Sequence, residues 1–483
     1  MVVKGFTRRL RPLELLTVDQ VQEIRASTLS VLERTGVRFE SDWALDFLKG
    51  NGCDVDFQNK RVRFPPGLVE ECLRKCPSTF HLKARDTQND LQLGGCTTYF
   101  SNAAAMNTID LDTYVPRPAT RQEFIQYVTV LDALEYFHYH NCSPYFGFKD
   151  TPSIMCLPED LALRLTYSTK HTQYCSSNDS EVFHIKMLKA IGTEGTGALT
   201  ASPPLTWYGD QVLQARRSIE AGFPVSTCEG SMMGATAPAT PVGSVVSSSA
   251  EQMAIIVLVQ LLHSGHPIAV GHSSFPMNMS NGAPSFGQID ASISNVLFNQ
   301  VWRSYRLPIF NWTPGFSNSK RMDFQTGYEK GVAGVLAALS GADMIFLYGC
   351  VSSEIAAHPL QAVLDDDVAG VIGHFIEGTQ ISDETLATNL IDEIGPIPGH
   401  YLSTAHTRKW WKIVQFLPKV ADRLTYPEWE KTGKKSCIDY AKLRLEEILK
   451  THKPSKLLTE NQEDSLRQIL EDAREYYKKK GMI

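Results

Sequence analysis

The sequence contains none of the short motifs that identify the common catalytic and metal sites. Its ten cysteines include no CxxC pair, and no HExxH segment occurs, so a zinc site would have no local ligand motif. There is no GxSxG elbow for a serine nucleophile, and no Walker A loop or GxGxxG turn for a nucleotide phosphate. Any functional site must therefore be assembled from residues that are distant in the sequence.

Charge of one sign and long apolar runs are also scarce. The net charge is −6, and the longest basic run is Lys478-Lys479-Lys480, so a nucleic-acid surface has no electrostatic support. We find no signal-like segment at the N-terminus and no apolar run of the roughly 20 residues that a membrane span needs. Together with the scattered cysteines, these features favour a reducing cytoplasm and no contact with a membrane.

What the sequence does contain is a regular alternation of strand-like and helix-like segments. With 483 residues, of which 43% are hydrophobic, the chain can bury a large core in one or two domains. Apolar strand-like runs, each followed by a helical pattern, occupy residues 136–142, 172–176, 199–206, 224–228, 267–272, 308–312 and 343–348. Seven such units predict an α/β fold of the (β/α)8 TIM-barrel type, in which periodicity does not place the eighth strand. A doubly wound open sheet is the alternative, but no glycine-rich turn follows the first strand.

The flanking segments differ from the repeating part. Residues 1–95 predict an N-terminal extension of helices and a small sheet, packed on the barrel. Residues 96–402 form the predicted barrel and catalytic domain. Residues 403–483 predict a helical C-terminal extension, which either crosses the barrel or forms a subunit contact in a homo-oligomer.

The predicted strand ends are rich in aromatic and neutral polar residues and poor in acids. In a barrel these ends meet on one face, which carries the active site. Aromatic rings suit a cation whose charge is spread over methyl groups, because cation–π attraction contributes roughly 0.5–2 kcal/mol per ring. The alternative is that the same rings simply fill the barrel core. The candidate substrate-binding residues are Tyr99, Phe100, His140, Trp207, Glu229, His272, Asn311, Trp312, Phe316, Phe346 and Tyr348.

The polar candidates allow more than one role. His138, His140 and His272 could orient a substrate carboxylate. Glu229 could balance an ammonium charge or cap the following turn. Zinc is the main rival, since His138, His140, Cys228, His272 and Cys350 all lie at or near strand ends. Two alternatives therefore stay open. One is a zinc-dependent barrel methyltransferase or hydrolase, and the other is a binding protein without catalysis.

Several segments together resemble the trimethylamine methyltransferase family, in the branch without pyrrolysine. The resemblance covers nearly the whole chain. It rests on SPPL (202–205), GATAPATPVG (234–243) with Glu251, GHPI (265–268), Gly315 to Glu329, GAD (341–343), DDD (365–367), IGP (394–396), GHYL (399–402), His406-Thr407, Asp422-Arg423 and Tyr426 to Trp429.

This resemblance implies a TIM barrel that moves a methyl group from an amine to Co(I) of a corrinoid (cobalamin) carried by a separate corrinoid protein. It implies no SAM and no metal bound directly by the barrel. No pyrrolysine occurs here, which favours a quaternary amine such as glycine betaine, because its charged nitrogen leaves without covalent activation. No residue is expected to act covalently or as an acid or base.

The resemblance also suggests which residues face the cofactor and the substrate. Gly234, Ala235, Thr236, Ser317 and Asn318 are the candidates for contact with the corrin ring or its protein. A histidine is expected on the strand after GAD, where this chain has Phe346. Proline betaine, carnitine and γ-butyrobetaine therefore join glycine betaine as candidate substrates.

Overall fold

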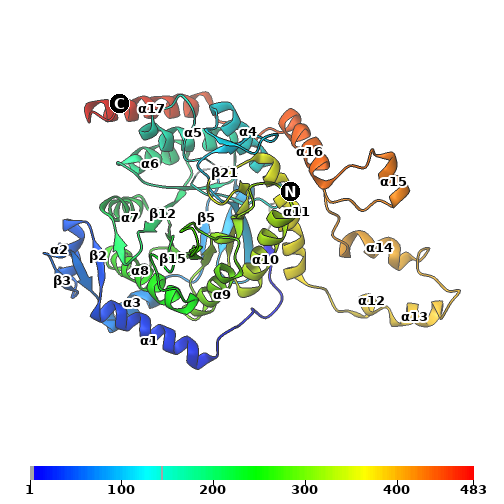
Figure 1. Ribbon diagram of the computed structural model, residues 1–483, viewed down its shortest axis with the longest axis horizontal. Helices are drawn as coiled ribbons and strands as arrows, with labels where there is room; N and C mark the ends of the chain where they lie inside the picture. Colours follow the sequence, from blue (N-terminus) through cyan, green and yellow to red (C-terminus); the bar gives the residue numbers. More distant parts are fainter. Residues whose placement is uncertain (1–4, 143–144) are drawn as a thin grey trace.

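The structure, a computed structural model, describes residues 5–142 and 145–483 and contains a closed barrel of eight parallel strands (Figure 1). Each strand pairs with the next in chain order, and the last pairs with the first. The predicted TIM barrel is thereby confirmed. The strands are β7 (Thr97–Asn102), β10 (Tyr139–His140), β11 (His171–Tyr174), β12 (Gly195–Ala201), β14 (Val225–Glu229), β16 (Ile268–His272), β18 (Ile309–Asn311) and β19 (Met344–Tyr348).

One helix follows each barrel strand and covers its outer side. Thr120 begins the first of them with a capping box that includes Glu123, and Gly341 ends another in the left-handed region at φ 103°. The eight helices are α4 (Arg121–Ala133), α5 (Cys156–Tyr167), α6 (Ser180–Ile191), α7 (Gly209–Ala221), α8 (Pro241–Leu262), α9 (Ile289–Arg303), α10 (Phe324–Ser340) and α11 (Pro359–Glu377).

Helix α8 corrects one expectation from the sequence. From the sequence we expected no apolar run long enough to span a membrane. The 22 residues of α8 are long and apolar enough to do so by length and composition. However, 78% of its most apolar window is buried inside the protein, against α1, α3 and α9. A helix that is apolar on all sides is expected where neighbours cover every face, and α8 has such neighbours.

The N-terminal extension covers the side and the floor of the barrel. β1 (Phe6–Thr7) pairs antiparallel with β7, and the hairpin of β5 (Phe80–Leu82) and β6 (Leu91–Leu93) packs under the barrel interior. A small sheet joins β2 (Val37–Phe39), β3 (Asp54–Asp56) and β4 (Arg61–Arg63) to β13 (Thr206–Trp207) from the barrel part. The helices here are α1 (Val18–Arg34), α2 (Asp42–Gly50), α3 (Pro66–Lys75) and the short η1 (Thr87–Asn89).

Short elements decorate the loops that follow the barrel strands. Three two-stranded pairs and two 3-10 turns lie there, on the side where the strands end. They are β8 (Thr108–Ile109) with β9 (Pro116–Arg117), β15 (Met232–Met233) with β17 (Phe275–Pro276), β20 (Cys350–Val351) with β21 (Ala356–Ala357), η2 (Ser153–Met155) and η3 (Thr313–Gly315). One disulfide, Cys142–Cys175, joins the ends of β10 and β11. Disulfides persist mainly in oxidising surroundings, so this disulfide is evidence against a reducing cytoplasm. The cytoplasmic location stays a prediction.

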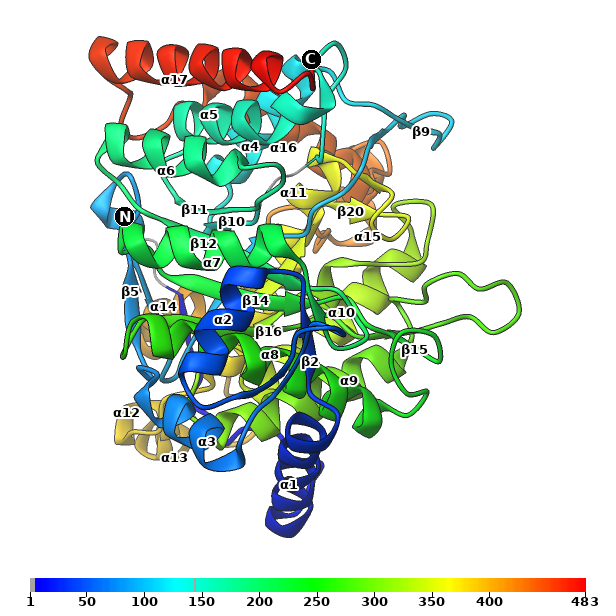
Figure 2. The ribbon, with the colours of Figure 1, turned by 90° about the vertical axis from the view of Figure 1, so that its left-hand side faces the viewer.

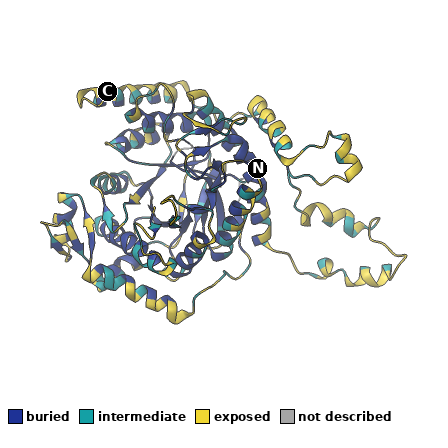
Figure 3. Ribbon diagram, viewed as in Figure 1, coloured by how far each residue is buried: buried dark blue, intermediate teal, exposed yellow. Residues whose placement is uncertain are grey.

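The chain after α11 first leaves the barrel and then returns to it. α12 (Asp383–Leu386), α13 (Thr388–Ile394), α14 (Ala405–Val414) and α15 (Tyr426–Lys431) project to one side in Figure 1, and Figure 3 shows them largely exposed. α16 (Cys437–Thr451) packs back on α4 and α11, and α17 (Glu460–Lys479) packs on α5 and α6. The division at residues 95 and 402 stays a prediction, while the last barrel helix ends at Glu377.

Candidate active site

The floor of the barrel interior is aromatic. Tyr139 on β10 lies with its ring centroid 5.9 Å from that of Phe310 on β18 and 6.4 Å from that of Phe346 on β19. β10 pairs with neither of these strands, so the contacts cross the inside of the barrel. Tyr99 joins the same cluster, and its hydroxyl accepts a hydrogen bond from the backbone N–H of Gln92 in the hairpin below (3.2 Å).

Trp312 lies above this floor, directly after β18. Its indole stacks on the ring of Phe346 with centroids 3.9 Å apart and planes 7° apart. Gly271 on β16 makes this position accessible, because a Cβ there would lie 2.8 Å from the indole Nε1. The side chain is half-buried, so Phe346 covers one part of it and another part stays open. Among the residues that the structure describes, Nε1 is buried without a hydrogen-bond partner.

A second unsatisfied polar atom belongs to Gln173 on β11. Its neighbours along the strand point outward, since Thr172 accepts from Arg164 on α5 and Tyr174 packs in the outer core. Gln173 therefore faces the interior, where its Nε2 donates to Ser226 on β14 across one intervening strand (2.7 Å). Its Oε1 is buried and finds no partner in the described part of the chain. Buried polar atoms are rarely left unpaired unless a ligand or water completes them.

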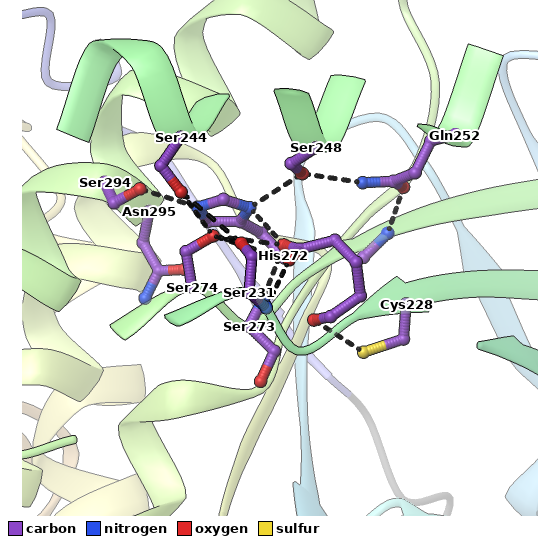
Figure 4. A network of polar contacts seen from close by, with 12 residues as sticks. Cys228, Ser231, Ser244, Ser248, Gln252, His272, Ser273, Ser274, Ser294 and Asn295 are labelled. Carbon is purple, nitrogen blue, oxygen red and sulfur yellow. Dashed lines mark hydrogen bonds and ion pairs between the residues drawn. The ribbon is translucent and has the colours of Figure 1, made fainter. Parts of the chain in front are cut away.

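Glu229 and His272 form a different kind of site, on the outer side of the barrel strands. Figure 4 shows His272 within the surrounding network of serines. The Nδ1 of His272 lies 2.8 Å from Oε1 of Glu229, and both side chains are fully buried. The carboxylate also accepts from the backbone N–H groups of Ser231 (2.8 Å) and Ser273 (3.2 Å). Burial raises the pKa of Glu229, but His272 and these hydrogen bonds outweigh it and bring the pKa to about 2. The pair thus holds together the loops after β14 and β16.

His272 is fully partnered in this position. Its Nε2 lies 2.8 Å from the hydroxyl of Ser294, and its ring stacks on Phe298 with centroids 4.4 Å apart. Both partners belong to α9, on the outer side of the strands. The structure therefore places Glu229 and His272 together, but away from Trp312.

Three further polar candidates also point outward from the strands. His140 lies 2.8 Å from the hydroxyl of Ser168, and Tyr348 donates to the carboxylate of Asp366 at 3.0 Å. Asn311 exchanges two hydrogen bonds with Asn299 on α9, at 2.8 and 2.9 Å.

The remaining aromatic candidates lie in the cores between strands and helices. Trp207 is fully buried and donates its indole N–H to the backbone carbonyl of Glu251 on α8 (2.9 Å). Phe100 packs on Phe6, and Phe316 packs on Phe286 with centroids 4.7 Å apart. Of all the predicted substrate-binding residues, the structure thus brings Tyr99, Trp312 and Phe346 together inside the barrel. Gln173 was missed, although a glutamine within a predicted barrel strand was a signal that could have found it.

The residues predicted to face the cofactor lie in loops after β14 and β18. Gly234 turns at φ 92° and stays exposed with Ala235, whereas Thr236 accepts a hydrogen bond from the N–H of Met232 (2.8 Å). Ser317 and Asn318 both donate to one carboxylate oxygen of Glu329 on α10, at 2.6 and 2.8 Å. A cavity of about 620 Å³ lies beside Asn318 and Glu329. Glu329 fixes this loop.

The rim of the mouth carries exposed apolar side chains. Six large apolar residues, each 44% to 85% exposed, follow different barrel strands; five lie in loops, and Phe324 is the first residue of α10. Because such loops gather at the C-terminal face of a barrel, these side chains surround the opening. They are Met106, Phe146, Tyr208, Met279, Phe324 and Ile355. Exposed apolar side chains gathered in this way are typical of a surface that binds another protein.

The zinc alternative has no matching cluster. Within residues 5–142 and 145–483, no group of three or more His, Cys, Asp or Glu side chains could hold a metal ion. His140 and His272 are engaged with Ser168 and Glu229, as described above.

Comparison with known proteins gives a consistent result. Residues 1–475 match the family model described as Trimethylamine methyltransferase (MTTB). The chain is 28% identical over 478 residues to the trimethylamine methyltransferase MttB of Desulfitobacterium hafniense, covering 95% of this chain and 94% of the relative. It is 28% identical over 465 residues to a glycine betaine methyltransferase from another strain of that species, covering 92% and 94%.

A solved structure supports the fold. The monomethylamine methyltransferase MtmB of Methanosarcina barkeri superimposes with a TM-score of 0.53, over 97% of this chain and 88% of that one. At 9% identity this likeness concerns the fold alone.

Proposed function

Because the chain belongs to the trimethylamine methyltransferase family, we propose that it transfers a methyl group from a quaternary amine to Co(I) of a corrinoid on a separate protein. A reduced corrinoid supplies a strong nucleophile for the methyl group. The residues of this chain bind the amine, orient it toward the mouth and exclude water, which can together contribute roughly 7–11 kcal/mol.

The observation that carries this proposal is Trp312, which is half-buried above the aromatic floor and whose buried Nε1 has no hydrogen-bond partner among the described residues. Its ring face attracts a trimethylammonium group, with Phe346 stacked behind it at 3.9 Å. Its unpaired Nε1 is a donor for an acceptor on the same ligand. A betaine combines both features, since a carboxylate accompanies the quaternary nitrogen. The substrate class is therefore glycine betaine or a related betaine such as proline betaine, carnitine or γ-butyrobetaine.

The proposed chemistry needs no catalytic acid or base. A quaternary ammonium leaves as a neutral tertiary amine, so no proton has to move during the methyl transfer. Inside the barrel, Gln173 offers a neutral amide and Ser226 a hydroxyl. Glu229 and His272 lie paired on the outer side of the strands.

The corrinoid fits the mouth from outside. Six exposed apolar side chains at the rim suit a protein that docks over the opening. The turn at Gly234, with its backbone exposed, and the loop at Asn318 are the candidates for contact with the corrin ring or its protein.

The test is methyl transfer with a panel of amines. The purified chain would be mixed with its corrinoid protein in the Co(I) state, and the absorbance of the corrinoid would be followed. We expect a change with one betaine and none with trimethylamine. The proposal would be refuted if no quaternary amine changes the absorbance of the corrinoid while Co(I) is verified in the same cuvette.

A further inference from the structure

The segment between α11 and α16, residues 378–435, is here called the arm, and it has almost no core of its own. The helices α12, α13, α14 and α15 contain no buried residue. Short helices without packed faces are marginal in water, and ordering a residue costs about 1–2 kcal/mol in backbone entropy. The arm therefore needs a partner surface that repays this cost.

The arm is nevertheless attached to the barrel in a defined position. Asp367 on α11 accepts backbone hydrogen bonds from Lys419 (2.8 Å) and Val420 (2.9 Å). Phe416 fills the space left by Gly370, where a Cβ would lie 2.6 Å from its ring. This anchor fixes where the rest of the arm is presented.

The outer part of the arm is also internally organised. Glu384 on α12 forms an ion pair with Lys409 on α14 and accepts from the indole N–H of Trp410 (3.3 Å). A cleft of about 700 Å³ lies between α12–α13 and α14, with Leu386 and Leu390 among its walls. These contacts give the outer part of the arm a defined shape.

The surface of the arm is strongly apolar. Ile397 is 94% exposed, Leu402 84% and Ile381 73%, and nine more large hydrophobic side chains of the arm are at least 40% exposed. Together they expose on the order of 1,000 Å² of apolar surface, more than a monomer usually leaves open and as much as one side of a stable dimer buries.

The outer part of the arm, α12 to α14, lies toward the end of the barrel opposite the mouth. Barrel helices run antiparallel to their strands, so the C-terminal end of α11, where the arm begins, is at the floor. In Figure 2, α12, α13 and α14 lie on the same side as β5 of the floor hairpin, whereas α15 lies near β20, on the side of the mouth. A corrinoid protein docked over the mouth would therefore leave α12, α13 and α14 uncovered.

We propose that the arm is the interface with a second copy of this chain. Its charged side chains nearly balance, seven acidic against eight basic, so two copies of the surface do not repel each other. Next to the root of the arm, α11 exposes Val371 (52%) and Phe375 (58%) on its outer face. In a two-fold dimer the arm of one copy covers this face of the other, and the reverse contact forms at the same time.

The experiment is sedimentation velocity on the full chain at micromolar concentration. We expect a mass of twice the 53.8 kDa of one chain. The substitutions Ile397→Glu and Leu402→Glu should each weaken self-association at least tenfold. Val18→Glu is the matched control, since Val18 is 76% exposed on α1 and a glutamate suits the first turn of a helix.

The two arm substitutions lie on exposed side chains, so the barrel should keep its far-UV circular dichroism spectrum. Loss of self-association in both arm variants, but not in Val18→Glu, would support the second copy. The proposal would be overturned if the wild-type chain is a monomer. This holds even if the arm of that monomer binds the corrinoid protein. A dimer that both arm variants retain would overturn it equally, because its interface would lie elsewhere.

Discussion

Replacing Trp312 with leucine should weaken betaine binding through the loss of one cation–π contact. The indole lies inside the barrel, where water competes little, and Phe346 holds its plane at 3.9 Å. A desolvated ring of this kind contributes about 2 kcal/mol, which corresponds to about a 30-fold rise in Kd. Leucine keeps an apolar side chain over the floor but offers no ring face and no indole N–H.

The assay is titration calorimetry with two ligands of the same shape. Glycine betaine carries the trimethylammonium group, and 3,3-dimethylbutanoate replaces its nitrogen with carbon while it keeps the carboxylate. We expect Trp312→Leu to weaken betaine binding far more than binding of 3,3-dimethylbutanoate, whose tert-butyl group carries no charge. Equal losses for the two ligands would mean that the indole acts by packing alone. No loss for either ligand would place the amine elsewhere in the barrel.

Three more predictions concern groups around this site. Tyr348→Phe should lower the free energy of unfolding by about 1–2 kcal/mol in urea, because Asp366 loses a buried hydrogen bond, and should leave betaine affinity unchanged. Folding lowers the pKa of Glu229 from 4.5 to about 2, so its carboxylate stabilises the fold fully above about pH 4.5, and this contribution disappears as the pH falls toward 2. The stability gap between wild type and Glu229→Gln, on the order of 3 kcal/mol at neutral pH, should therefore shrink below pH 4.5 in denaturation curves recorded across pH; a constant gap would contradict this. Met279→Asp and Phe324→Asp should each raise the KM for the corrinoid protein several-fold, whereas rates with free cobalamin stay at the wild-type level; equal effects on both acceptors would exclude a docking role for the rim.

The barrel was predictable from the sequence because seven of its strands are apolar runs at regular spacing. The eighth strand, β7, was not placed because it follows an irregular stretch and because four of its six residues are polar, so it contains no apolar run. The family was also predicted correctly, from motifs spread over the whole chain. These features depend on local sequence, which a reader can inspect directly.

The site was harder to predict because it depends on which way each side chain points. Successive residues of a strand face opposite sides, so Asn311 points to α9 while Trp312 points inward. A boundary error of one residue exchanges these two roles. The sequence also does not show which side chains pair with residues that are far away along the chain. Asp365 lies inside α11 and pairs at 2.6 Å with Lys330 of α10.

The hydrogen bonds of the individual site candidates connect the fold to the proposed chemistry. Behind the strands, Glu229, His272 and Asn311 have their hydrogen-bonding partners within the protein, so a ligand there would have to break existing bonds. Inside the barrel, Nε1 of Trp312 and Oε1 of Gln173 are buried and, within the described residues, unpaired. Leaving such atoms unpaired costs about 1–3 kcal/mol each, a cost that a ligand with a carboxylate can remove at the indole. A betaine that binds there accepts a hydrogen bond from the indole N–H and also contacts the ring face. Its methyl transfer requires no proton from the surrounding residues.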